Sequence, residues 1–156
     1  MHRRLIAACA SLAGGAAAAL AAAPAQAATI ADCNEYAMTT FVAEPWEQSS
    51  RTFYNGQVRL VVTDTDGEPV CCSTWLVVIF PNADDELGGR TCRMVGSASG
   101  LGWTGVDMKG VKSTYAAATG LTITVPVRRM IDGDRIVNET VKLRLDLRTS
   151  RLTLVP

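Results

Sequence analysis

The sequence predicts an all-β domain, either an antiparallel β-sandwich or a small barrel-like fold, stapled by disulfide bonds. From Gln57 onward, apolar side chains recur at every second position, which is the period of half-buried strands. Pairs such as Asp66-Gly67 and Gly88-Gly89 separate these runs and favour tight turns. Several short strands joined by such turns are typical of sandwiches and small barrels.

Residues 1–27 have the features of an export signal. Two arginines near the start precede an Ala-rich run over residues 5–23, and residues 25–27 (Ala-Gln-Ala) form the pattern that signal peptidase cleaves. A membrane anchor fits less well, because alanine is weakly apolar and Pro24 interrupts the run. We therefore expect one domain, residues 28–156, in the bacterial periplasm or outside the cell, with no membrane span.

Composition restricts the chemistry of this domain. Without the two signal arginines, 13 basic side chains face 15 acidic ones, which argues against a nucleic-acid partner. The single histidine, His2, is removed with the signal. The remaining domain therefore lacks imidazole, which is the commonest general base and the commonest metal ligand in proteins. Histidine triads and Cys/His zinc sites are therefore excluded, and we expect neither a cofactor nor a metal.

Charge is distributed unevenly along the chain. Residues 32–86 contain ten acids and two arginines, whereas residues 87–156 contain eleven basic and five acidic side chains. Such asymmetry can mark a binding face. The interpretation we favour is that strands from the two halves lie side by side, so that their outward charges pair.

The expected elements follow in order. The segment before Gln57 is aromatic and less regular, and a short helix or an added strand fits it, since Pro45 prevents one continuous element. Residues 57–64 alternate cleanly. The run from Val70 to Phe80 is apolar on both faces, which indicates a central strand. The remaining strands are expected at residues 91–95, 121–127, 137–147 and 152–155.

The last two hairpins allow their registers to be predicted. A two-residue turn at Asp132-Gly133 would mix buried and exposed positions, so we expect a three-residue loop with Gly133 or its neighbour at positive φ. The apolar pairs this aligns are Val125 with Val141, Ile123 with Leu143, and Leu121 with Leu145. For the next hairpin the expected pairs are Leu147 with Leu152 and Leu145 with Leu154.

Four cysteines remain after the signal: Cys33, Cys71, Cys72 and Cys92. An even number in a small exported domain indicates two disulfides. Adjacent strand residues face opposite sides, so we expect Cys71 and Cys72 to bond separately, one to Cys33 and one to Cys92. A redox-active Cys71/Cys72 pair is less favoured, because no cationic neighbour or helix start would activate its thiols. A four-cysteine zinc site is also less favoured, because the side chains of adjacent strand residues point away from a common ion.

Two motifs resemble chemical sites. Residues 100–105 match the dinucleotide pattern G-x-G-x-x-G, but no helix or suitably spaced acid follows, so a plain loop is favoured. Residues 84–86 (Asp-Asp-Glu) fit a solvated acidic loop better than a cation site. The irregular stretch from Gly96 to Gly120 carries two aromatic residues, Trp103 and Tyr115. With Trp46 they form the candidate binding surface, although Trp103 is better explained as a cap on the core.

Three segments resemble those of an uncharacterised group of small, exported, β-rich bacterial proteins: residues 54–62, 86–95 and 119–127. The resemblance implies secretion and a β-rich domain, and it assigns no activity. The sequence thus favours a non-enzymatic structural or binding module of the cell envelope, with a partner protein or ligand still to be identified. The alternatives are a protein-binding or inhibitor module that uses the 96–120 loop and, less favoured, a redox protein that uses Cys71 and Cys72.

Overall fold

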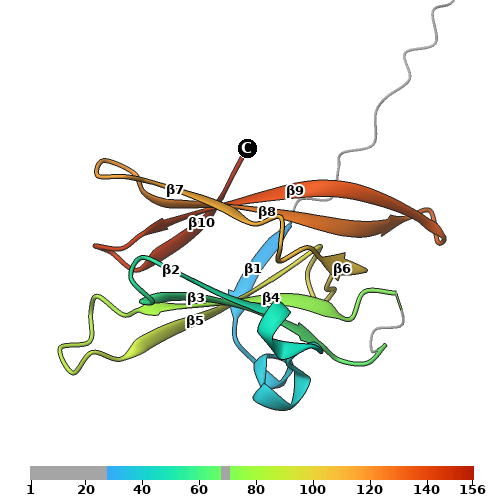
Figure 1. The fold of residues 1–156 in the computed structure, drawn as a ribbon, viewed down its shortest axis with the longest axis horizontal. Coiled ribbons are helices and arrows are strands. Elements are labelled where there is room, and N and C mark those ends of the chain that lie inside the picture. Colours follow the sequence, from blue (N-terminus) through green and yellow to red (C-terminus); the bar gives the residue numbers. More distant parts are fainter. Residues whose placement is uncertain (1–27, 68–70) are drawn as a thin grey trace, which may run out of the picture.

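The computed structural model describes residues 28–67 and 71–156. Its strands form two five-stranded antiparallel sheets, which pack as two layers (Figure 1). The all-β prediction is confirmed, and the structure selects the sandwich over the barrel. Within the described ranges, no helix is long and apolar enough to cross a membrane. The expected export signal, residues 1–27, lies outside the described part of the chain.

The first layer is the N-terminal sheet, in the order β1-β5-β4-β3-β2. Its strands are β1 (Thr29–Asp32), β2 (Ser50–Phe53), β3 (Val58–Asp64), β4 (Thr74–Pro81) and β5 (Arg90–Gly96). The predicted central strand is confirmed as β4, which lies in the middle of the sheet. Leu76 and Val78 are buried toward the second layer, whereas Trp75 and Val77 belong to a separate cluster on the outward side.

The N-terminal segment covers this outward side. Three short 3₁₀ helices lie between β1 and β2, at Glu35–Ala37, Thr39–Phe41 and Trp46–Gln48. The ring of Tyr36 stacks on that of Trp75 with centroids 5.7 Å apart. The segment therefore contains both a short helix and an added strand, the two alternatives that its sequence left open.

The second layer is the C-terminal sheet, in which β10, β9 and β8 are neighbours and both β6 and β7 pair with β8. Its strands are β6 (Gly105–Val106), β7 (Lys112–Ala116), β8 (Gly120–Ile131), β9 (Arg135–Asp146) and β10 (Arg151–Val155). Consecutive parts of the chain thus build separate sheets. Strands from the two charge halves lie side by side where β5 pairs with β1 and β4, and Asp32 and Arg93 form the one ion pair among the described residues that joins the halves.

The register predicted for β8 and β9 is confirmed. Val125 lies opposite Val141, and Ile131 opposite Arg135, which leaves a three-residue loop with Gly133 at φ 86°. The register predicted for β9 and β10 is wrong by two residues, because Leu152 lies opposite Leu145. A shift of two leaves every side chain on the same face, so burial alone does not distinguish the two registers.

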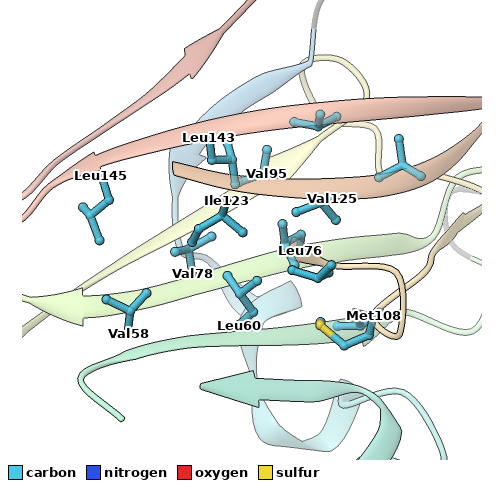
Figure 2. Close-up of a cluster of buried hydrophobic side chains, with 14 of the residues drawn as sticks. Val58, Leu60, Leu76, Val78, Val95, Met108, Ile123, Val125, Leu143 and Leu145 are labelled. Carbon is cyan, nitrogen blue, oxygen red and sulfur yellow. The ribbon is translucent and has the colours of Figure 1, made fainter. Parts of the chain in front are cut away.

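Inward-facing aliphatic side chains of both sheets form the main core. Figure 2 shows Leu60, Leu76 and Val78 of the N-terminal sheet pointing toward Ile123 and Leu143 of the C-terminal sheet. All five side chains are fully buried. Each such burial contributes about 1.5–3 kcal/mol relative to an exposed side chain, so this contact holds the layers together.

Gly120 begins β8 at a position that only glycine fits. Its φ is 83°, and a Cβ atom there would overlap the carbonyl oxygen of Leu145 on β9. Glycine at this position therefore allows the turn between β7 and β8 to continue into β8 directly beside the backbone of β9.

We expect Gly120→Ala to lower the free energy of unfolding by at least about 2 kcal/mol, because strain and overlap combine. Gly133→Ala is the matched control, since Gly133 has a similar φ but a Cβ atom added there would meet nothing within 4 Å. Its expected cost is about 1 kcal/mol, from the left-handed backbone alone. Urea unfolding measures both variants, and equal losses would contradict the role of the close contact.

Candidate functional site

The structure separates the three aromatic residues of the predicted binding surface. Trp103 is 1% exposed and belongs to the main core. It therefore caps the core, and its ring is not accessible to a partner. Trp46 and Tyr115 are 59% and 56% exposed. The 96–120 stretch is also less irregular than expected, because it contains β6 and β7.

The predicted disulfide connectivity is wrong. Cys33 is bonded to Cys92, and Cys71 is bonded to its neighbour Cys72. The prediction assumed that the doublet lies in a strand, where adjacent side chains diverge. Instead β4 begins only at Thr74, and the doublet lies in the connection before it. These two bonds include all four cysteines of the described residues.

The two bridges have different structural roles. Cys33 and Cys92 flank the outward cluster of the N-terminal sheet, so their bond fixes the N-terminal segment to β5. The doublet lies beside the segment that crosses between the sheets: the N–H of Gly102 donates to the carbonyl of Cys72 (2.8 Å), and Thr74 and Trp103 exchange backbone hydrogen bonds.

We expect Cys33→Ala/Cys92→Ala to lower the free energy of unfolding by about 4 kcal/mol, because the bond closes a long chain loop. The cysteines are 59 positions apart. The bond between Cys71 and Cys72 closes no comparable loop. Cys71→Ala/Cys72→Ala should therefore lower the free energy of unfolding by about 1 kcal/mol or less. Denaturant unfolding measures the stabilities, and peptide mapping of the unreduced protein checks the pairing. A bridge from Cys71 or Cys72 to Cys33 or Cys92 would contradict this assignment.

The most site-like aromatic group is a pair of tyrosines, Tyr54 and Tyr115. Their ring centroids lie 5.6 Å apart with the planes inclined by 36°. Tyr54 is 42% exposed and lies between β2 and β3, whereas Tyr115 lies on β7. The pair therefore connects edge strands of different sheets. The sequence points to Tyr115 as a candidate binding residue. It does not point to Tyr54, which it only places in the aromatic segment before Gln57.

Tyr54 has an unusual backbone conformation. Its φ is 53°, and Asn55 and Gly56 follow at 54° and 79°. Asn and Gly tolerate this left-handed region, but a bulky aromatic residue there costs about 1–3 kcal/mol. The N–H of Gln57 donates to the carbonyl of Tyr54, and Arg90 donates to the carbonyl of Gln57, so the turn is fixed from both sides.

Further contacts link β2 to the second sheet along the same edge. The guanidinium of Arg51 donates to the carbonyls of Val111 (2.9 Å) and Met108 (3.3 Å). It also lies 5.5 Å from the ring centre of Phe53. β7 follows Val111, and all five of its side chains are exposed. We refer to Tyr54, Tyr115 and Ser113, together with the backbone edge of β7, as the aromatic edge.

A shallow groove of about 560 Å³ provides a second candidate site. Its walls include Trp103, Val141 and Leu154, and the ion pair between Arg129 and Glu139. The Arg129 side chain is 13% exposed, and its hydrogen bond to Glu139 raises its pKa, against the lowering effect of burial. Since each partner satisfies the other, this pair is explained as a structural contact at the groove.

We expect Glu139→Gln to lower the free energy of unfolding by about 1–3 kcal/mol, because it leaves a mostly buried guanidinium without its carboxylate. Asp132→Asn is the control: Asp132 and Arg135 form an exposed ion pair in the β8–β9 turn, and its loss should cost under about 0.5 kcal/mol. Thermal and urea unfolding measure both variants. Equal effects would show that the partial burial of Arg129 is energetically unimportant.

The acidic loop at residues 84–86 and Asp107 do not form a common metal-binding group. Across residues 28–67 and 71–156, no group of three His, Cys, Asp or Glu side chains could hold a metal ion. Asp85 and Asp107 each accept hydrogen bonds from backbone N–H groups of their own loops. These carboxylates are therefore explained by loop structure.

Comparison of the chain with protein-family models, curated proteins and solved structures finds no match. The functional argument therefore depends on the surface itself.

Proposed function

We propose that this protein is an exported, non-enzymatic binding module that contacts its partner through the aromatic edge. One observation carries the proposal: Tyr54 occupies a left-handed backbone position and places its exposed ring against that of Tyr115. Strained residues that the surroundings hold in place are found preferentially at functional sites. Asparagine or glycine would form the same turn at lower conformational energy. The turn therefore does not require the tyrosine side chain, which favours a role for that side chain in binding.

The chemistry of the aromatic edge suits binding. Tyrosine combines a large apolar ring with a hydroxyl group, which makes it frequent in protein interfaces. Ser113, two positions from Tyr115 on β7, adds an exposed hydroxyl group on the same side of the strand as that ring. The pairing partner of β7 in its own sheet is β8, and no second described strand pairs with it. An extended segment of a partner protein could therefore add along its free edge.

Export is supported by the sequence features of residues 1–27 and by the composition of the cysteines. Two disulfides in a small domain are typical of an oxidising compartment. Ala28, the residue that follows the proposed cleavage site, packs against the core.

The test compares three forms of the immobilised, oxidised protein in the same cell-envelope extract. We expect the wild type and Trp46→Ser to retain a common partner that Tyr54→Asn/Tyr115→Ser does not retain. Asparagine tolerates the left-handed backbone at position 54, so this variant should keep the turn. Trp46→Ser controls for the loss of an exposed aromatic ring elsewhere.

The retained molecule is then purified and its affinity measured directly. Loss of the two rings should weaken binding by at least about tenfold, as for aromatic residues at the centre of an interface. Equal binding by the wild type and the tyrosine variant would contradict the proposal. Turnover of ester, glycoside or peptide substrates by the purified protein would contradict its non-enzymatic character.

A further inference from the structure

The outward face of the C-terminal sheet carries a group of unpaired cations. Leu121, Ile123 and Val125 are buried, so the alternate residues of β8 and their cross-strand neighbours face outward. The basic residues at these outward positions are Lys112 on β7, Arg128 on β8, Lys142 and Arg144 on β9, and Arg151 on β10. We call this surface the basic face.

These cations are free to interact with an external partner. All five residues are exposed, and none belongs to an ion pair among the described residues. Lys142 donates only to the carbonyl of Pro156. At the outward strand positions of the described C-terminal sheet, Asp146 is the one carboxylate; it lies at the end of β9 and accepts hydrogen bonds from Arg148.

The charges are spread in two dimensions, over four neighbouring strands. Lys112, Thr124 and Lys142 are cross-strand neighbours, which places the two lysines about 9–10 Å apart. Arg144 follows Lys142 by two positions, about 7 Å along β9. Figure 1 shows the C-terminal sheet as an outer layer, with no other described element lying over its outward side.

We propose that the basic face docks on the surface of an anionic lipid membrane. Lipid headgroups present negative charge as a plane, and each Lys or Arg held near such a surface adds to the attraction. A single polyanionic strand would instead match a line or groove of cations. Lys142 also lines the groove at Trp103, and Arg151 lines a second depression between β5 and the β9–β10 turn.

An apolar contact accompanies the charges. Ile136 is 49% exposed, and it pairs with Met130 at outward positions near the β8–β9 turn. These side chains could enter the headgroup layer while the cations contact lipid phosphates. Most acids of residues 32–86 belong to the opposite half of the sandwich. Repulsion of that half from the membrane would orient the basic face toward the lipid.

The test is cosedimentation of the purified, oxidised protein with vesicles. We expect binding to vesicles that contain phosphatidylglycerol and phosphatidylcholine, weaker binding as salt is added, and no binding to phosphatidylcholine alone. Lys142→Gln/Arg144→Gln should weaken binding by about 30-fold, from two lost cations. Arg59→Gln/Lys109→Gln removes the same charge from positions outside the basic face and should bind like the wild type.

Equal binding to both kinds of vesicle would overturn the proposal, as would an equal loss in the Arg59/Lys109 control. Binding to soluble poly-glutamate without binding to vesicles would also overturn it, and would identify the face as a site for acidic polymers. Tyr54→Asn/Tyr115→Ser should bind vesicles as the wild type does. That result would separate membrane docking from the function proposed for the aromatic edge.

Discussion

The structure depends on the contact between the inward faces of two sheets. Leu60, Leu76 and Val78 meet Ile123 and Leu143 in a fully buried layer, and removing either sheet would expose the other's apolar face. This constraint also fixes the register of β8 and β9, because a slip by one residue would turn their apolar side chains toward solvent. The need for glycine at position 120 follows from the same constraint. A side chain there would separate β8 from β9, which the core holds together.

The two outward faces of the sandwich differ in what covers them. The N-terminal segment lies over the N-terminal sheet, where Tyr36 stacks on Trp75 and the bond between Cys33 and Cys92 holds the segment in place. The C-terminal sheet has no such cover among the described elements and presents threonines and cations to solvent. The fold thus leaves one broad face and one edge available for contacts.

These two surfaces have different chemistry and therefore different physical roles. The aromatic edge concentrates apolar area and hydroxyl groups in a small region, which favours a specific partner. The basic face spreads positive charge over several strands, which favours weak, salt-dependent attraction to a surface.

The sequence by itself determined the all-β class, the central strand β4 and the β8–β9 register, because alternation and turn residues are local signals that burial makes consistent. It could not determine the β9–β10 register, where a shift of two preserves every face, or the sulfur pairing, which depends on where Cys71 and Cys72 leave the strand. Tyr54 and Tyr115 are far apart in the chain, and five dispersed cations share one face. The packing of the two sheets brings the tyrosines together, and strand pairing within the C-terminal sheet brings the cations together. Both arrangements join residues that are distant in the chain, so no local sequence pattern records them.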